Sequence, residues 1–531
     1  MTSRSWTVAS PHASASAAAV EVFERGGNAV DAALAAAVTL TVVYPNQCSM
    51  GGDLIALVGD KDGTVHAVDG SGRAPRALTP AALGPSASTF MPVYGHFAVT
   101  VPGAVSAWHH LAEHWGSVPL RDILLHASEL AADGVAVAPG LARDLSREQS
   151  RLLQDEGMRA IFVDDGAPLD EGATLRQPQL ARTLAELSEG GSDAFYKGAI
   201  GESLVRRLRH LGSSVTTGDF SDHQTSMRQP LSATYSDVDY LAAPPGSQGV
   251  FFLEGLAALE VVRQSLGRAL DPLGEDAVTV ALVLGAAARD RDALLGDPDV
   301  ATVDVETLLT RRATEIAWSF LSGQTPAAIA SPAPGPRASG DTVAIVAADS
   351  DGTWISLIQS NFHAFGSGIL DPDSGVILHN RGASFSLAPN SPNLLAGGRR
   401  PAHTLMPVLV RESGKLVGAH GTMGGRAQPQ IHTQIALHLA NGCQPGEAVS
   451  HPRWVLGPME AGGGDASALD VIKVEQDVSS SPQQRLRDAG FSLTALPTDD
   501  DGVGHAQLVR SSATGFVGAT DPRADGSAIT G

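Results

Sequence analysis

Thr342 marks a sharp change in the composition of the chain. Residues 323 to 341 are rich in Pro, Ala, Gly and Ser, which is typical of an exposed or cleavable segment, and a β-branched apolar run begins directly after them. A threonine hydroxyl is a poor nucleophile unless a base removes its proton, and the residue's own α-amine, with a pKa of ~7.7–8.0, can be that base. The amine exists only if the bond between Asp341 and Thr342 is cut. The pattern therefore fits an N-terminal-threonine nucleophile, although β-propensity alone also favours a threonine at a strand start.

A nucleophile that attacks an amide carbonyl also needs backbone donors that hold the oxyanion. Gly424 and Gly425, in the stretch "GTMGGRAQPQ", lie on a turn before a helical pattern, where glycine amides can point at a ligand. A glycine pair before a helix is usually only a turn, so this signal is weak by itself. The glycine pair indicates an oxyanion site only when it is considered together with Thr342.

The composition narrows the class of protein. The chain has 531 residues, 43% of them hydrophobic, which is enough for a large core or for several packed lobes. Its net charge of -21 disfavours nucleic acid as a partner. No apolar run approaches the ~18 residues of a membrane span, and the first residues lack the apolar segment of a secretory signal. We therefore expect a cytoplasmic protein with no membrane partner.

Other reactive residue types form no convincing set. Cys48 and Cys443 are the only cysteines, which predicts neither a disulfide framework nor a metal-ligand cluster. No Ser/His/Asp arrangement or metal spacing stands out, so no cofactor and no metal are expected. Asp53, which follows a glycine turn, is interpreted as a turn former, as are Asp349 and Asp351.

The periodicity of the chain indicates which elements must hold these residues. An Ala-rich helix ends at Gly26 and Gly27 and a second begins near Asn28, followed by a hairpin with Asp62 and Gly63 at its tip. Residues 100 to 330 are mainly helical in pattern. After Thr342 short strands dominate, with one good helix in "QPQIHTQIALHLANG". This segregation predicts an α+β layered core.

Nine ordered stretches, spread over nearly the whole chain, carry a family resemblance. They are "GGNAVDAALAA", "TVVYPNQCSMGGD", "VTVPGAVSAW", "AFYKGAIGESLVRRL", "GDTVAIVAADSDG", "FGSGILDPDSGVILHN", "RRPAHTLMPVLV", "GTMGGRAQPQ" and "GATDPRADGSAITG". Together they resemble the gamma-glutamyltranspeptidase family of N-terminal-nucleophile (Ntn) hydrolases.

The resemblance implies a four-layer αββα sandwich that cleaves itself between Asp341 and Thr342 by an N-to-O acyl shift. The products would be a large subunit, 1–341, and a small subunit, 342–531, intertwined as a heterodimer that could itself dimerise. Thr342 would then be nucleophile and, through its α-amine, its own base. Ser360 falls where the family keeps a hydroxyl that steadies the nucleophile, and Gly424 and Gly425 fall on the oxyanion pair.

The chain departs from the family pattern at the residues that bind the α-carboxylate and the α-ammonium of a γ-glutamyl substrate. Glutathione-accepting members use an arginine in "R-E-x-A-P" for the α-carboxylate, but this chain reads "SGRAP", with Ser71 in that place and Arg73 two residues on. They use an aspartate after "N-N-x-x-D" for the α-ammonium, but "HNRGASF" has Ser384 there. Arg381 could supply a replacement carboxylate contact or could be structural.

Two smaller departures lie near the same region. His403 and Thr404 replace a pair of serines, and Phe362 aligns with a family asparagine whose role the adjacent Asn361 could take. Losing two charge-assisted hydrogen bonds of ~1.5–3 kcal/mol each should weaken γ-glutamyl recognition by orders of magnitude.

The prediction is an autoprocessed amidohydrolase or acyltransferase that cleaves a small-acid amide through an acyl-enzyme, with water or an amine as acceptor and with altered acyl specificity. Family members resembling oxamate amidohydrolases and cephalosporin acylases match that description. The alternatives are a genuine γ-glutamyl hydrolase or transpeptidase of glutathione metabolism and, from another class, a non-catalytic binding homologue.

Overall fold

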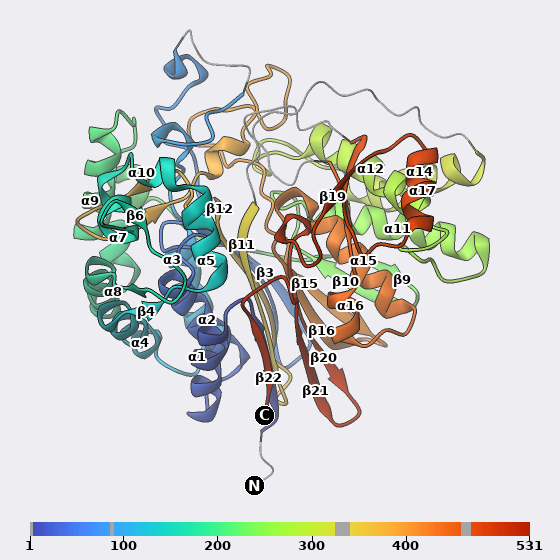
Figure 1. Ribbon diagram of the computed structural model, residues 1–531, viewed down its shortest axis with the longest axis horizontal. Coiled ribbons are helices and arrows are strands. Elements are labelled where there is room, and N and C mark those ends of the chain that lie inside the picture. The colour runs from blue at the N-terminus through green and yellow to red at the C-terminus, as the bar shows by residue number, and fades with distance from the viewer. Residues whose placement is uncertain (1–3, 85–89, 324–339, 458–468) are drawn as a thin grey trace.

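Two antiparallel sheets form the centre of the computed structural model, which describes residues 4–84, 90–323, 340–457 and 469–531. Most of the Pro/Ala/Gly/Ser segment lies outside these residues. Figure 1 shows the sheets side by side with helices outside both. The first sheet has the order β22 (Ser527–Thr530), β1 (Trp6–Ser10), β11 (Gly340–Asp349), β12 (Trp354–His363), β2 (Asp53–Gly59), β3 (Val65–Asp69) and β8 (Ser226–Arg228). The second has the order β21 (Gly515–Thr520), β20 (Ala506–Ser512), β16 (Lys415–Thr422), β15 (Val408–Glu412), β10 (Val238–Ala242) and β9 (Leu231–Tyr235).

Apolar side chains of the two sheets share one buried cluster. Strands such as β11 and β12 are buried on both faces and consist largely of β-branched and apolar residues, as expected between two layers. The members that meet between the sheets include Ala344, Val346 and Ile358 from the first sheet and Leu409, Ala419 and Val509 from the second.

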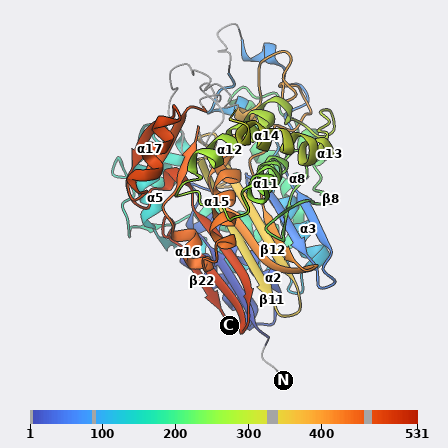
Figure 2. The ribbon, with the colours of Figure 1, turned by 90° about the vertical axis from the view of Figure 1, so that its right-hand side faces the viewer.

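Helices cover the outer face of each sheet (Figures 1 and 2). The first sheet is covered by α1 (Ala13–Glu24), α2 (Ala29–Val43), α3 (Ala104–Trp115), α4 (Leu120–Asp133), α8 (Pro178–Tyr196) and α9 (Ala199–His210). The second is covered by α11 (Gly249–Leu266), α12 (Ala277–Leu294), α14 (Ala313–Leu321), α15 (Gln428–Ala440) and α17 (Ser480–Asp488). The predicted four-layer αββα sandwich is confirmed.

Shorter elements connect these layers. They are α5 (Pro139–Arg147), α6 (Gln149–Leu152), α7 (Glu156–Phe162), α10 (Thr217–Ser221), α13 (Val305–Thr307), α16 (Pro445–Ser450), η4 (Arg381–Ser384), η5 (Gly425–Ala427) and a three-stranded sheet of β17 (Trp454–Leu456), β18 (Val471–Glu475) and β19 (Ser492–Leu496).

The boundaries predicted near the N-terminus are confirmed. Gly26, with φ of 90°, follows the end of α1, and Asn28 caps α2 by accepting from the amides of Val30 and Asp31 while Asp31 returns a capping-box contact. The hairpin of β2 and β3 turns through Gly63, whose φ of 80° suits glycine. These local signals place β2, which carries a residue of the site.

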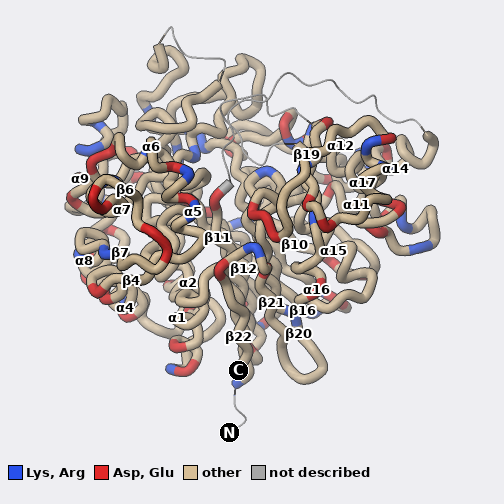
Figure 3. Tube along the Cα trace, in the orientation of Figure 1, with Lys and Arg blue, Asp and Glu red and all other residues tan. Residues whose placement is uncertain are grey.

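Charged residues are spread over both helical layers (Figure 3). None of the described helices has the length and apolar character needed to cross a membrane.

Candidate active site

The bond between Asp341 and Thr342 lies at a β-bulge in the centre of the first sheet. Asp341 is the register partner of Phe362, and the register then shifts, so that Ser360 and Asn361 of β12 lie opposite Thr342 alone. Thr342 is 1% exposed. A bulge re-aims the side chains around it, and here it brings hydroxyl groups of neighbouring strands together.

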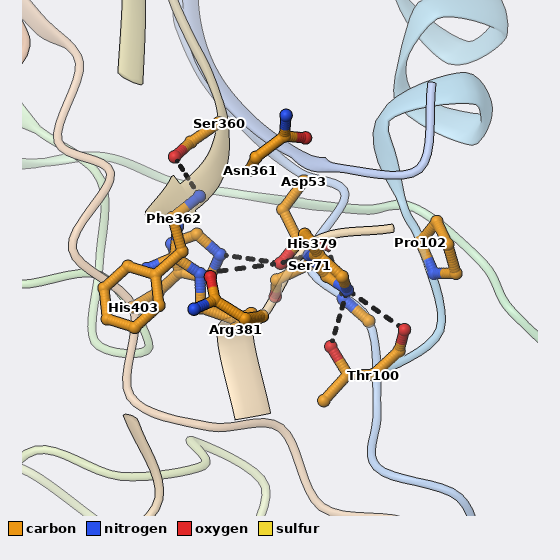
Figure 4. A network of polar contacts seen from close by, with 12 residues as sticks. Asp53, Ser71, Thr100, Pro102, Ser360, Asn361, Phe362, His379, Arg381 and His403 are labelled. Carbon is orange, nitrogen blue, oxygen red and sulfur yellow. Dashed lines mark hydrogen bonds and ion pairs between the residues drawn. The ribbon is translucent and has the colours of Figure 1, made fainter. Parts of the chain in front are cut away.

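The hydroxyl of Ser360 joins Thr342 to the carbonyl group that precedes it (Figure 4 shows Ser360 and its amide donor). Thr342 Oγ1 donates to Ser360 Oγ at 2.9 Å, and Ser360 Oγ donates to the carbonyl oxygen of Asp341 at 2.7 Å. The backbone amide of Phe362 also donates to Ser360 Oγ, at 2.7 Å. One serine therefore orients the candidate nucleophile and polarises the carbonyl of the predicted cleavage site.

Phe362 holds this amide in place through an unusual backbone conformation. Its φ is 79°, a region that non-glycine residues rarely adopt and that costs on the order of 1–3 kcal/mol. The ring is buried, and the Arg381 guanidinium lies over it with 4.1 Å between Cζ and the ring centroid. The packing of the Phe362 ring therefore holds this strained backbone conformation beside Ser360.

A buried charged cluster adjoins Ser360 on the other side (Figure 4). Asp53, the first residue of β2, is the register partner of Ser360. Its Oδ2 lies 3.1 Å from His403 Nε2, 3.3 Å from His379 Nδ1 and 3.8 Å from Arg381 Nε. We call Asp53, His379, Arg381 and His403 the Asp53 cluster, and each of them is at most 1% exposed.

The surroundings fix the protonation of two members of this cluster. Burial alone would raise the pKa of the Asp53 carboxyl, but the charge of His379 and the hydrogen bonds of His379 and His403 outweigh it and hold that pKa well below its usual range. Burial, followed by the Arg381 charge, lowers the pKa of His403 to about 4 against the opposing effect of Asp53. Because the amide of Leu405 donates to His403 Nδ1, the proton of the neutral ring sits on Nε2 and points at Asp53.

The interpretation of Asp53 as a turn former is wrong. Its carboxylate is wholly buried and also accepts from the amide of Gly72, so it organises a charged cluster instead. Sequence reasoning missed Asp53 and His379 because the partners come from distant segments. The nearest available signal was the sequence "HNRG", which places His379 two residues before Arg381. Asp349, in contrast, accepts from the amides of Asp351 and Thr353 in a turn, as predicted.

The two arginines proposed as carboxylate contacts lie in different surroundings. Arg381 is fully buried, and its Nη1 donates to Thr404 Oγ1 at 2.9 Å. The side chain of Arg73 is 40% exposed and binds Asp299 at 2.5 Å and the carbonyl of Gly398 at 2.9 Å. Arg381 therefore belongs to the Asp53 cluster, whereas Arg73 belongs to an ionic network near the surface.

The side chains of Ser384 and Asn361 form hydrogen bonds that join neighbouring segments of the chain. Ser384 Oγ donates to the carbonyls of Arg381 at 2.9 Å and Ala402 at 3.0 Å, which ties together the segments carrying Arg381 and His403. Asn361 accepts from Ser49 Oγ at 2.7 Å and donates to the carbonyl of Pro45 at 3.1 Å, so its amide group is bound to the loop before β2.

The glycine pair lies on a turn that contacts β11. Gly424 and Gly425 have φ of 145° and 52°, and the turn continues through η5 into α15. Gln248 Nε2 donates at 2.7 Å both to the carbonyl of Gly425 and to that of Thr404. One buried amide therefore couples the glycine turn to the segment beside Arg381, which is a geometry suited to holding backbone donors rigid.

Three comparisons with known proteins identify the family of this chain. The gamma-glutamyltranspeptidase family model matches residues 15–531. The chain is 33% identical to the glutathione hydrolase-like YwrD proenzyme of Bacillus subtilis, covering 98% of each chain. It is also 33% identical to the oxamate amidohydrolase proenzyme of Klebsiella pneumoniae, covering 98% of this chain and 97% of that one.

The fold agrees with a solved structure as well. Cephalosporin acylase from Bacillus halodurans superposes with a TM-score of 0.86 at 30% identity, covering 99% of this chain and 96% of the other. Because the family match spans almost the entire chain and the relatives are named as hydrolases and acylases, the chain is an enzyme of the gamma-glutamyltranspeptidase family.

Proposed function

We propose that this chain is a self-processed N-terminal-threonine amidohydrolase or acyltransferase whose acyl group is a small acid other than γ-glutamyl. The observation that supports it most is the position of the Ser360 hydroxyl between Thr342 Oγ1 and the Asp341 carbonyl. A serine in that position serves both the attacking atom and the carbonyl under attack.

These hydrogen bonds support a specific route for self-cleavage. Thr342 Oγ1 attacks the carbonyl carbon of Asp341, its proton passes to Ser360 Oγ, and the Ser360 proton passes to the carbonyl oxygen. Collapse of this intermediate re-forms the carbonyl and breaks the C–N bond, while the proton of the hydroxyl passes to the departing nitrogen of Thr342. The products are a free α-amine and an ester between Asp341 and the Thr342 side chain. Water hydrolyses the ester, which frees the α-carboxylate of Asp341 and restores the Thr342 hydroxyl beside the α-amine that the shift released.

The mature enzyme would use the same hydroxyl on a substrate. The Thr342 α-amine accepts the hydroxyl proton, Oγ1 forms an ester with the acyl group, and the proton moves to the departing amine. Water or a second amine then attacks the ester and regenerates Thr342. The amides of Gly424 and Gly425 would stabilise the oxyanion in both steps, held by Gln248.

The charges around the site support an acyl group without an α-ammonium. Arg381 and the Thr404 hydroxyl can orient a carboxylate of the substrate. At the position where the family has its ammonium-binding aspartate, this chain has Ser384, whose hydroxyl is hydrogen-bonded to backbone carbonyls. The carboxylate of the Asp53 cluster, that of Asp53 itself, already contacts Arg381 and the two histidines of the cluster, so it is not a partner for a substrate ammonium group. The relatives named oxamate amidohydrolase and cephalosporin acylase support the same conclusion.

A gel and a substrate panel test the proposal. On a denaturing gel the 54.6 kDa chain should give fragments of about 35 and 20 kDa, in proportion to length, and Thr342→Ala should remain whole and inactive. Thr183→Ala, which removes another buried threonine hydroxyl, on α8, should still be processed. An intact, inactive wild type would instead favour the non-catalytic binding homologue.

The processed enzyme is then assayed with glutaryl, oxamate and γ-glutamyl amides of comparable leaving groups. Preference for the first two supports the proposed specificity. A strong preference for the γ-glutamyl amide would establish the alternative, a glutathione-type hydrolase, which the name of the Bacillus subtilis relative favours.

A further inference from the structure

Three metal-binding side chains converge far from Thr342 in sequence and outside the cluster described above. His438 is in the last turn of α15, Cys443 follows that helix, and His451 follows α16. One ligand atom from each lies within 4.8 Å of the other two, and Cys443 Sγ is 3.7 Å from His451 Nε2. The fold brings together three residues whose spacing in the sequence matches no familiar metal-binding motif.

The backbone places these side chains by specific contacts. The amide of Cys443 donates to the carbonyl of His438 at 3.1 Å, and Gly442, with φ of 88°, makes the turn that this contact requires. The carbonyl of His451 accepts from the buried Arg523 at 3.1 Å. The three side chains are therefore positioned by the end of α15, by the turn at Gly442 and by the hydrogen bond from Arg523.

One member is buried without a hydrogen-bond partner. His438 is 5% exposed, and its Nε2 has no hydrogen bond to any described residue. A buried imidazole nitrogen without a partner is costly unless something binds it.

We propose that His438, Cys443 and His451 form a binding site for a borderline-soft divalent cation of the Zn²⁺ class. Two imidazoles and one thiolate are a common zinc donor set, and solvent would complete a tetrahedron. Ligand atoms around zinc are roughly 3.3–3.8 Å apart when bonds of ~2.0–2.3 Å are tetrahedral. The rings of His438 and His451 stack with centroids 4.3 Å apart, so they would turn toward each other to bind one ion. A surface cavity of about 380 Å³ lined by Cys443, Gly442 and Arg510 gives access.

The site would stabilise the corner between α15 and α16. Because α15 starts just after the glycine turn at Gly424 and Gly425, the metal would fix the far end of the helix that carries that turn. The proposal does not depend on the enzymatic activity, since none of the three ligands contacts Thr342 or the Asp53 cluster in any described interaction.

Cobalt titration of the untagged full-length chain tests the site. Co²⁺ bound to a thiolate gives a near-ultraviolet charge-transfer band, so the wild type should develop this band to one equivalent and lose it on adding Zn²⁺. Cys443→Ser should abolish the band, and His438→Gln should weaken Co²⁺ binding at least about tenfold. Circular dichroism of the metal-free variants checks folding, and Cys443→Ser is close enough in size to remain informative if His438→Gln unfolds.

A second histidine pair supplies the matched control. His110 and His114 stack with ring centroids 4.0 Å apart, one turn apart on α3, and can also bind a cation weakly. His114→Ala should leave the charge-transfer band intact, because that pair has no thiolate. The proposal is overturned if the wild type gives no such band or if Cys443→Ser retains it.

Discussion

Ser360 of β12 lies directly opposite Asp53 of β2 in the sheet register. On its other side Ser360 binds Thr342 of β11, so three adjacent strands carry, in order, a buried charge, a hydroxyl and the candidate nucleophile. Because neighbouring strands are ~4.8 Å apart, this register alone brings the Asp53 cluster within two strands of the reacting bond.

Replacing Ser360 by alanine should slow self-cleavage on the order of 10²-fold, because the proton transfer and the polarisation of the Asp341 carbonyl are lost together. The conversion of precursor into fragments is followed on gels over time. Ser356→Ala is the matched control, since Ser356 is four residues earlier on β12, equally buried, and donates to the carbonyl of His420 in the other sheet. Equal processing rates for the two variants would remove the role given to Ser360.

Replacing Asp53 by asparagine should lower the free energy of unfolding by about 3–5 kcal/mol, because it removes one partner of a wholly buried ion pair with Arg381. Urea unfolding measures the loss. Asp351→Asn removes a carboxylate that is 65% exposed and pairs with Arg4, and it should cost less than about 1 kcal/mol. A loss at Asp53 no larger than that of the control would contradict the assignment of Asp53 as the charge that matches Arg381.

Local signals predicted the elements well but could not predict the Asp53 cluster. The cap at Asn28 and the turn at Gly63 depend on residues close in sequence, so their positions follow from propensity. Asp53 meets His403 across 350 residues, and a carboxylate after a glycine turn has the same local sequence whether it is buried or exposed. Only the register of β2 with β12 decides between those outcomes.

The same limit applies to residues inferred by family resemblance. The sequence could not choose between Arg73 and Arg381, whereas the fold buries Arg381 beside Phe362 and leaves Arg73 near the surface. The bulge at Thr342 was not predictable either, because it is a property of the pairing between two strands rather than of one segment.

Stability should decrease as pH falls from about 6.5 to about 4, and His403 should account for part of the slope. Its folded pKa of about 4 lies below the unfolded value of 6.5, so in this window the unfolded chain binds the extra proton and is favoured by acid. Above 6.5 the contribution is fully present. His403→Gln, which can still donate to Asp53, should reduce the pH slope of the unfolding free energy by about one proton in that window.

Unfolding in urea at several pH values gives this slope directly. His114→Gln, which replaces an exposed imidazole on α3, is measured beside it for comparison. An unaltered slope in His403→Gln would show that its protonation does not oppose folding.

Replacing Gln248 by leucine should lower kcat of the processed enzyme about tenfold or more with a smaller change in KM. The variant loses the two donations that join Gly425 to Thr404, while the side-chain hydrogen bond between Thr404 and Arg381 is left in place. Under the proposed mechanism the amides of Gly424 and Gly425 are then held less well for the oxyanion. Gln177→Leu, which removes another buried amide, one that donates to the carbonyl of Val42 in the helical layer, should cost stability without this effect on kcat. Similar kcat values for both variants would rule out a positioning role for Gln248.

Replacing Ser384 by aspartate should shift specificity toward γ-glutamyl amides. The new carboxylate would stand where family members hold the α-ammonium, and one charge-assisted hydrogen bond of ~1.5–3 kcal/mol corresponds to roughly 10- to 150-fold in kcat/KM for the γ-glutamyl over the glutaryl amide. The ratio of the two kcat/KM values cancels differences in folding and processing. Ser384→Ala loses the same hydrogen bonds to the carbonyls of Arg381 and Ala402 but adds no charge. It should therefore leave the ratio of the two kcat/KM values unchanged. If the aspartate and alanine variants give the same ratio, the residue at 384 does not explain the acyl preference, and recognition of the substrate's amino group must come from elsewhere in the site.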